Sequence, residues 1–317
     1  MNDLERAVVS KGRRFLLRVE TSHEAADYEK YEDLRDEIWG FPDDHLAGTR
    51  NMMCENFLAE GSSLFIGAFA EAAGGGFPND AAHLAGFSYG FVGVRDKAVG
   101  FRDPANLRFY SQFTGVRRDF RSSGLGILIK EFQREIVLGR FGLGTVICTY
   151  DPLTGVNAHR NVHHFGMEVL EYRIATYGEY GGLLNRADIA SDRFLMSWDL
   201  RKPLTRASAP PVGACGSVLR VEDRRVAGRT AAVSVEVVSG SDLGLEDDGL
   251  LVPVPRDFYR MLEETDVDDP AVRRIPVDWR LHTRRAFLDL FERGYRVTDF
   301  LKSAGSPPRG SYLLVRS

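Results

Sequence analysis

The stretch from residue 107 to residue 150 constrains the fold most, because two apolar runs flank an amphipathic helix there. The first run is LRFYSQFTGV, and the second, TVICTY, is a continuous apolar segment typical of a buried central strand. Between them, FRSSGLGILIKEFQREIVLG opens on two serines and two glycines and then places apolar residues at helical spacing, namely Leu125, Leu128, Ile129, Phe132 and Ile136. A strand, a helix and a second strand in this order predict a βαβ unit with two parallel strands.

The rest of the chain alternates short strand-like and helix-like segments. We expect helices at about 22–39, 45–58 and 277–292, a short helix at 157–165, and strands at 63–70, 83–94, 167–175, 193–200, 218–221 and 231–238. On the helix that follows residue 124, Lys130 and Gln133 are predicted to face away from the sheet. The prolines of the run LLVPVP predict an edge strand.

Domain organisation follows from one change in composition. Residues 201–217 are poor in large apolar side chains and contain three prolines, which predicts a linker. We therefore expect an α/β (α+β) protein with a first domain at residues 1–200, a linker at 201–217, and a C-terminal α+β segment at 218–317 that packs on the first domain.

Composition and charge argue against nucleic acid and membranes as partners. The 317 residues include 41 Lys and Arg against 45 Asp and Glu, a formal net charge of −4, which provides no basic surplus for a phosphodiester backbone. The longest apolar stretch, around residues 64–70, is too short to span a bilayer, and the first 20 residues lack the apolar block of a signal peptide. The three cysteines are far apart and lack zinc-type spacing, which suits a reducing compartment. We expect a cytoplasmic protein that binds neither nucleic acid nor membranes.

The glycines at the start of the predicted helix at residue 125 need an explanation, because glycine lowers helix stability. The first-turn N–H groups have no partner within a helix and lie at the positive end of its dipole. With no Cβ at Gly124 and Gly126, an anion such as a pyrophosphate could approach these groups closely, and Arg121 could add a charge-assisted contact. The alternative is that the glycines permit close packing of the helix on the sheet. The R-x-x-G-x-G spacing is neither a P-loop nor a dinucleotide fingerprint.

Four segments together resemble the GNAT superfamily of acyl-CoA N-acyltransferases. They are the strand YSQFTGV, the R-x-x-G-x-G loop with its helix, the strand TVICTY and the junction HFGMEV, and the resemblance covers about residues 14–200. More specifically, YDPLTGVNAHRNVHHFGMEV, TYGEYGG and SDRFLMSWDL resemble a branch of predicted acetyltransferases associated with N-acylamino-acid racemases, whose relatives N-acylate amino acids. This branch resemblance continues, more weakly, through WRLHTRRAFLDLFERGYRVTDF. The resemblance implies a GNAT-type mixed twisted sheet flanked by helices.

The same resemblance implies a site for acetyl-CoA or another acyl-CoA as co-substrate. The co-substrate would lie where two parallel strands splay apart, at residues 115–116 and 149–150. Its pyrophosphate would meet backbone N–H groups and an arginine, namely those of Ser123, Gly124, Leu125 and Gly126 together with Arg121. Its pantetheine would pair with exposed strand backbone at Phe113, Gly115 and Val116 and with the side chain of Asn157. A strand N–H would polarise the thioester carbonyl, and an amine would attack it directly.

Proton transfer is where the sequence departs from the GNAT pattern. Many GNAT members place a tyrosine four residues before the glycine of the helix–strand junction, as general acid for the leaving thiolate, and that position is Val162 here. Tyr150 and His163 are the nearest substitutes. Gln112 stands in the strand where some relatives carry an acid or a histidine, and it could hold a water or the substrate. The catalytic candidates are therefore Tyr150, His163 and Gln112, with loss of the amine proton to solvent as the alternative.

Several residues near these segments have competing interpretations. His159 and His163, four residues apart, could be metal ligands on one helix face together with His164. Zinc needs a third ligand of suitable geometry and no H-E-x-x-H arrangement is present, so we expect no metal. Cys148, in an apolar strand, is expected to be buried and inert. Asn157 is as well explained as the N-cap of the short helix as by a role at the site.

Charged residues further along the chain also have two interpretations. Asp192 and Arg193 are predicted to form a structural ion pair, with a role for Arg193 in binding a substrate carboxylate left open. The stretch from Trp279 to Phe287 is expected to pack as core, and Arg280 and Arg284 on one face of that helix could help to close an acceptor pocket.

Together, these observations predict an enzyme that moves an acetyl or other short acyl group from CoA to the amine of a small molecule, with an amino acid as the acceptor that the resemblance implies. Two other functions stay open, a non-catalytic acyl-CoA-binding or regulatory module and a protein N-acetyltransferase. The sequence also allows a homodimer.

Overall fold

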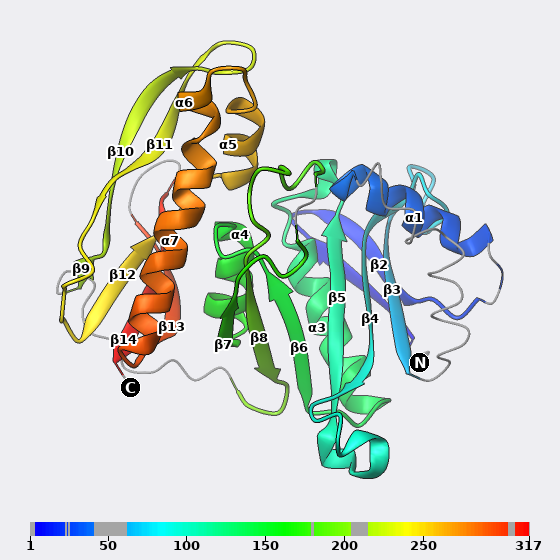
Figure 1. Cartoon of the computed structure of the whole chain (residues 1–317). Coiled ribbons are helices and arrows are strands. Elements are labelled where there is room, and N and C mark those ends of the chain that lie inside the picture. The colour runs from blue at the N-terminus through cyan, green and yellow to red at the C-terminus, as the bar shows by residue number, and fades with distance from the viewer. Residues whose placement is uncertain are drawn as a thin grey trace. The chain divides into compact units, whose positions relative to one another are not determined.

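The computed structural model describes residues 4–22, 24, 26–40, 62–178, 181–203, 215–303 and 308–316 (Figure 1). The chain divides into two compact units, of which unit 1 comprises residues 1–148 and 199–201, and unit 2 comprises residues 149–198 and 202–317. The predicted domain boundaries at residues 200 and 217 stay a prediction. The helix predicted at 45–58 and most of the predicted linker lie outside the described residues.

Unit 1 is built on a mixed sheet in which the strands follow the order β1-β2-β3-β4-β5-β6. Neighbouring strands are antiparallel up to β5, whereas β5 and β6 are parallel. The strands are β1 (Glu5–Ser10), β2 (Arg13–Val19), β3 (Ser63–Ala70), β4 (Leu84–Val94), β5 (Leu107–Val116) and β6 (Thr145–Tyr150). The predicted pair of parallel strands joined by a helix is therefore confirmed.

Helices cover both faces of this sheet. The helical segments of unit 1 are α1 (Ala26–Trp39), α3 (Leu125–Gly139) and the short 3₁₀ turns η1 (Gly100–Arg102), η2 (Pro104–Asn106) and η3 (Arg118–Phe120). A Cβ added at Gly115 would lie 2.7 Å from Trp39 of α1, whereas a Cβ at Gly86 would lie 3.2 Å from Ile129 of α3. Gly86 pairs with Val116, and side chains alternate between faces along a strand, so α1 and α3 lie on opposite faces.

The contact between α3 and the sheet corrects one prediction. Lys130 and Gln133 do not face away from the sheet but are buried, with 3% and 0% of their surface exposed. Lys130 Nζ donates to Ser111 Oγ at 2.6 Å, and Gln133 Nε2 donates to Ser88 Oγ at 2.7 Å. Since the strands provide serine hydroxyls opposite these side chains, their polar groups are satisfied and their burial is tolerated.

Unit 2 contains three sets of paired strands. β7 (Glu168–Arg173) pairs antiparallel with β8 (Arg193–Asp199), and β10 (Leu219–Ala227) pairs antiparallel with β11 (Ala232–Ser241). A four-stranded sheet has the order β13 (Tyr295–Lys302), β14 (Gly310–Arg316), β12 (Gly249–Pro253) and β9 (Gly216–Ser217). The prediction that LLVPVP forms an edge strand was wrong, because β12 lies between β14 and β9. Pro253 of β12 stands at the last residue that pairs with β14, where the missing N–H of proline interrupts little of the ladder.

The helices of unit 2 are short except for one. They are α4 (Gly155–Ala158), which continues as the π-helix η4 (His159–His164), α5 (Phe258–Glu264), α6 (Pro270–Arg273) and the long α7 (Ile275–Glu292). Trp279 and Phe287 of α7 are fully buried, which confirms that this stretch packs as core. Gly294, with φ of 86°, follows the end of α7 in a left-handed conformation that glycine favours at the end of a helix.

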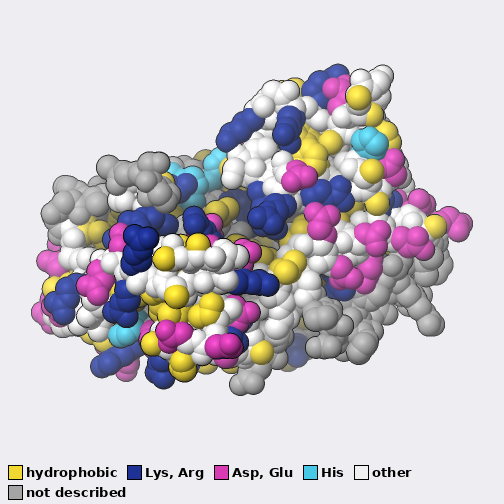
Figure 2. Space-filling view, turned by 90° about the horizontal axis from the view of Figure 1, so that it is seen from above, with side chains coloured by type: hydrophobic (Ala, Val, Ile, Leu, Met, Phe, Trp, Pro, Cys, Tyr) yellow, Lys and Arg dark blue, Asp and Glu magenta, His cyan; other side chains and the backbone are white. Residues whose placement is uncertain are grey.

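Charged side chains of both signs, Lys and Arg as well as Asp and Glu, occur on the face of the molecule seen in Figure 2. This agrees with the small formal net charge of −4. Among the helices that the structure describes, none is long and apolar enough to cross a membrane.

Candidate functional site

The loop between β5 and α3 has a backbone shape that glycine makes available. Gly124, directly before the first residue of α3, has φ of 88°, and Ser122 has φ of 59°. Ser123 lies between these two left-handed residues, and its hydroxyl donates to the carbonyl of Phe120 at 2.7 Å while accepting from the N–H of Leu125 at 3.2 Å. Left-handed residues alternating with other conformations turn successive N–H groups toward one side, which is the arrangement of an anion-binding nest.

The predicted phosphate donors differ in how their N–H groups are used. Within the described residues, the N–H groups of Ser123, Gly124 and Gly126 have no hydrogen-bond acceptor, so they are available to an anion. The N–H of Leu125 is instead engaged by the hydroxyl of Ser123, as in a helix cap. The side chain of Arg121 is exposed and donates through Nε to the carbonyl of Val116 at 3.3 Å, so it lies beside the same loop.

The strand that leads into this loop separates from its parallel neighbour. In the described part of the chain, the parallel ladder consists of Phe109 with Val146 and Tyr110 with Ile147, while β5 runs on to Val116. Against β4, the register shifts so that Gln112 is an extra, bulged residue, and its side chain is exposed. A bulge bends its strand and increases the local twist, which accounts for the early end of the ladder.

Beyond the bulge, β5 keeps its pairing with β4 on one edge. Phe113 pairs with Tyr89, and Gly115 pairs with Phe87. In an antiparallel pair, every second residue turns its backbone N–H and C=O away from the partner strand. The last residues of β5 therefore present backbone groups toward the side where β6 no longer pairs with them.

The remaining predicted site residues, Tyr150, Asn157 and His163, belong to unit 2. Tyr150 is buried, and its hydroxyl lies 3.0 Å from the hydroxyl of Tyr312, which donates to the carbonyl of Pro152 at 2.8 Å. Burial raises the pKa of Tyr312 well above its usual value. The Tyr150 hydroxyl is thus part of a buried chain of hydrogen bonds.

Asn157 is not the N-cap of the short helix, because α4 begins at Gly155 with Thr154 before it. The Asn157 amide donates to Thr154 Oγ1 at 3.1 Å and its oxygen accepts from Arg160 at 3.0 Å. Val162, where GNAT relatives carry a tyrosine, is buried and offers no group for proton transfer.

His163 lies on the π-helix η4, a type of segment that is frequent at functional sites. Its Nδ1 lies 2.8 Å from Asp299 Oδ1 on β13, and its ring stacks on His159 with centroids 4.7 Å apart. Burial, followed by the charges of Lys302, His163 and His164, lowers the pKa of His159 to about 4. Among the described residues, no three His, Cys, Asp or Glu side chains are grouped so that they could hold a metal ion.

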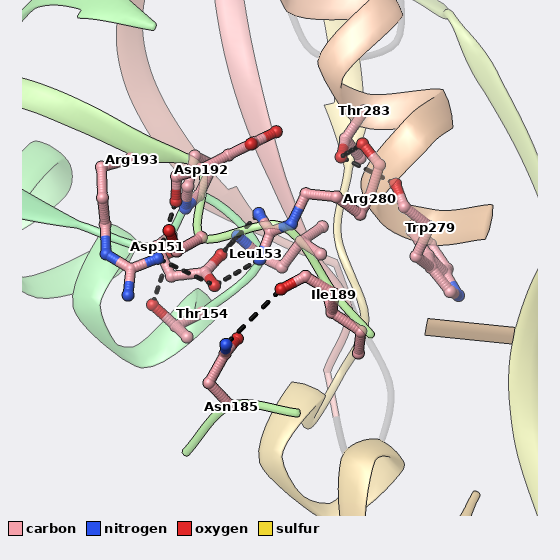
Figure 3. Close-up of polar contacts among 12 residues, drawn as sticks. Asp151, Leu153, Thr154, Asn185, Ile189, Asp192, Arg193, Trp279, Arg280 and Thr283 are labelled. Carbon is pink, nitrogen blue, oxygen red and sulfur yellow. Dashed lines mark hydrogen bonds and ion pairs between the residues drawn. The ribbon is translucent and has the colours of Figure 1, made fainter. Parts of the chain in front are cut away.

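A buried group of charges, which sequence reasoning did not find, joins the start of β8 and the end of β6 to α7 (Figure 3). Asp151 accepts from both terminal nitrogens of Arg280, one of them at 2.9 Å, and its carboxylate lies 3.6 Å from Arg193. Asp192 accepts from Arg284 at 2.8 and 2.9 Å. Burial raises the pKa of Asp151, but Arg280 and Arg193 outweigh it and hold that pKa below its usual value.

This group corrects one prediction. The carboxylate of Asp192 does not pair with the guanidinium of Arg193. It pairs with Arg284 and accepts a hydrogen bond from the Tyr172 hydroxyl at 2.7 Å. Arg193 donates instead to the backbone carbonyl of Asp192. Asp192 directly precedes β8, which begins at Arg193, and its carboxylate is taken up by Arg284 and Tyr172 instead. Arg280 and Arg284 are therefore engaged by carboxylates, an arrangement that only the spacing of four residues on one helix face could have suggested.

Comparison with known proteins gave matches to solved structures alone: no family model matches the chain, and no curated protein does. A GNAT-family acetyltransferase from Streptococcus pneumoniae is 14% identical with a TM-score of 0.40, over 57% of this chain and 97% of that one. A ribosomal-protein-S5-alanine acetyltransferase from Vibrio fischeri is 12% identical with a TM-score of 0.43, over 62% and 100%. The spermidine/spermine N-acetyltransferase SpeG from Vibrio cholerae is 9% identical with a TM-score of 0.39, over 58% and 93%.

Proposed function

We propose that this protein is an acyl-CoA-dependent N-acyltransferase that transfers an acetyl or other short acyl group to the amine of a small molecule, with an amino acid as the acceptor class. The observation that carries the proposal is the loop before α3, where the N–H groups of Ser123, Gly124 and Gly126 have no acceptor among the described residues. Such donors at a helix N-terminus suit a pyrophosphate. The resemblance of the surrounding segments to the GNAT superfamily supports CoA as its carrier, and the resemblance to the racemase-associated branch supports an amino acid.

The reaction would proceed by direct attack. The nitrogen lone pair of the acceptor forms a bond to the thioester carbonyl carbon, and the carbonyl π electrons move to oxygen. A backbone N–H of β5 beyond the bulge would donate to that oxygen and stabilise the developing negative charge. The carbon–sulfur bond then breaks with its electron pair on sulfur, the nitrogen loses a proton to water, and the thiolate takes up a proton, so the products are an amide and CoA thiol. Gln112, exposed at the bulge, would hold the amine or the water that takes its proton.

The assignment of the proton-transfer groups in unit 2 is part of this proposal. We favour His163 over Tyr150 as the group that donates a proton to the leaving thiolate, because His163 is partly exposed and its ring is oriented by Asp299. The hydroxyl of Tyr150 is buried against Tyr312, where transfer of its proton to a leaving thiolate would require the core to open.

One observation favours a second function, a non-catalytic acyl-CoA-binding module. Val162 stands where GNAT relatives carry the general acid. Tyr150, at the end of the preceding strand, has the nearest hydroxyl in sequence on that strand, and it is buried. A protein of this kind would bind CoA esters through the same loop and release no CoA in the presence of amines. Binding alone therefore does not separate the two functions, and turnover must be measured as well.

The binding test is a calorimetric titration of acetyl-CoA, succinyl-CoA and free CoA against the wild type and Gly124→Glu. The variant places a carboxylate where a phosphate is expected, and repulsion and bulk should abolish binding. Its control is Gly142→Glu, because Gly142 also has positive φ, 66°, and a Cβ there meets nothing within 4 Å. The control thus carries the same charge and the same backbone strain roughly 20 Å away, beyond the other end of α3.

We expect micromolar binding by the wild type and by Gly142→Glu, and none by Gly124→Glu. Absence of binding by the wild type would refute the acyltransferase and the acyl-CoA-binding module together. If binding is found, release of CoA thiol should be followed with amino acids, polyamines and peptides as acceptors. Turnover with amino acids is the expected result, whereas binding without turnover of any amine would favour the binding module.

A further inference from the structure

The turn between β1 and β2 lies against the loop that precedes α3, within unit 1. Ser10 pairs with Arg13, so Lys11 and Gly12 form a two-residue hairpin turn. Both have positive φ, 47° and 78°, as a type I′ turn requires. Sequence patterns could not predict this contact, because more than 100 residues separate the hairpin from the loop.

Three side chains of this hairpin donate hydrogen bonds to three backbone carbonyls of the loop. Ser10 Oγ donates to the carbonyl of Ser123, and Lys11 Nζ donates to the carbonyl of Ser122 at 2.6 Å. Arg13 Nη1 donates to the carbonyl of Asp119 at 3.1 Å, and its guanidinium lies 5.2 Å from the ring centre of Phe120. The hairpin therefore contacts the loop through donors to its main chain.

The planarity of the peptide bond gives these contacts a consequence. In a trans peptide, the C=O of one residue and the N–H of the next point in opposite directions. The carbonyl of Ser122 shares a peptide with the N–H of Ser123, and the carbonyl of Ser123 shares one with the N–H of Gly124. Lys11 and Ser10, by holding these carbonyls, direct the two N–H groups away from the hairpin. A carbonyl that accepts a hydrogen bond also polarises its peptide, which strengthens the N–H as a donor.

We propose that Ser10 and Lys11 are positioning residues for the co-substrate, which they aid by fixing the orientation of the Ser122–Ser123 and Ser123–Gly124 peptides. This inference rests on the proposed function, since it assumes that these N–H groups receive the pyrophosphate of a CoA ester. It assigns part of the affinity for CoA to a hairpin that lies outside the R-x-x-G-x-G motif.

A different role for the hairpin would be direct charge attraction between Lys11 and a phosphate of CoA. Ser10 distinguishes the two roles, because its hydroxyl carries no charge and can act on the ligand only through the Ser123 peptide. Ionic strength distinguishes them as well, since attraction between exposed charges weakens as salt is added. Arg14 supplies a matched control on β2: it is a cation near the hairpin, but its partners are Glu71 and the ring of Phe77.

The experiment is calorimetric titration of CoA against the wild type, Ser10→Ala, Lys11→Met and Arg14→Met, each at low and high salt. We expect Ser10→Ala and Lys11→Met each to weaken binding by about twofold to tenfold, the effect of losing one hydrogen bond. Ser10→Thr and Lys11→Arg, which keep the donors, should restore binding. In the protein without ligand, the amide NMR signals of Ser123 and Gly124 should shift in Ser10→Ala and keep their positions in Arg14→Met.

Three results would overturn the proposal. If the wild type binds CoA and both Ser10→Ala and Lys11→Met bind it within twofold as well, the hairpin does not position the loop, although the proposed function stands. If Lys11→Met alone weakens binding, and only at low salt, Lys11 acts as a charge and the positioning role is wrong. If the wild type does not bind CoA, the proposed function fails and the inference fails with it.

Discussion

Replacement of Arg280 by methionine should destabilise unit 2 strongly, because it removes the partner of a buried charge. The side chain of Arg280 is 1% exposed, and that of Asp151 is 11% exposed. Asp151 accepts two hydrogen bonds from Arg280 and one from the N–H of Leu153 at 2.9 Å. Methionine fills much of the same volume, so the main loss is the compensation of the carboxylate rather than packing.

The expected loss follows from what remains around Asp151 in the variant. Its nearest cation would be Arg193, 3.6 Å away, which makes an ion pair without the two parallel hydrogen bonds. Removing one partner of a buried ion pair costs about 3–5 kcal/mol, since the other charge is left buried. With a urea dependence of about 3 kcal/mol per molar, the midpoint of unfolding should fall by roughly 1 to 1.7 M.

The assay is urea unfolding followed by tryptophan fluorescence, with Trp279 one residue before the substitution as a local probe. The control is Arg274→Met, directly before the same helix, because Arg274 and Asp278 form an exposed pair with 66% and 44% of their side chains accessible. Such a pair contributes about 0.3–0.5 kcal/mol. A loss below about 1 kcal/mol in Arg280→Met would refute the argument from burial. Adding Asp151→Asn to Arg280→Met should recover part of the loss, since the charge left unpaired is then gone.

Three further predictions concern pH and packing. The pKa of Asp151 is lowered in the folded protein, so its contribution to stability is present above the usual pKa of 3.8. This contribution is lost as the pH falls through the lowered pKa. The difference in unfolding free energy between wild type and Asp151→Asn should therefore shrink below about pH 4. His159 should titrate near pH 4 by NMR, because burial disfavours its charged form, and stability should decrease as the pH falls from 6.5 toward 4, less so in His159→Gln. Gly86→Ala should lower the unfolding free energy by about 1–3 kcal/mol, because its Cβ would meet a backbone oxygen at 2.8 Å. Gly93→Ala is the control: a Cβ at Gly93 has open space around it, so this variant should unfold like the wild type in the same urea assay.

Local patterns predicted the fold where the signal lies within one segment. The apolar run of residues 145–150 and the helical spacing after residue 124 determined the parallel strand pair and its crossover helix, because burial imposes both periodicities directly. The same reasoning misplaced Lys130 and Gln133, whose partners are serines on strands β5 and β4. The helical pattern shows which residues are polar, but it does not show which hydrogen-bond partners the facing strands provide for them.

Contacts between distant residues were not accessible to this reasoning. The pairs Asp151–Arg280, His163–Asp299 and Ser10–Ser123 each join residues more than 100 positions apart. Each residue alone has an ordinary local explanation, such as a turn, a solvated helix or a hairpin end. Only the fold decides which donor meets which acceptor, so the glycines of the loop could be found from the sequence but the hairpin that contacts it could not.

The backbone of this loop, more than its charged side chains, should decide what it binds. Ser122 keeps a left-handed conformation that costs an ordinary residue of order 1 kcal/mol, and such strain persists where the surroundings hold it in place. Here the surroundings include Lys11, which donates to the carbonyl of Ser122, and Ser10, which lies 3.1 Å from the position of a Cβ on Gly124. The hairpin therefore closes one side of the loop and leaves the N–H groups of Ser123 and Gly124 directed to the other. An anion held by such groups is selected by the positions of its oxygens, whereas exposed arginines nearby would attract any negative charge.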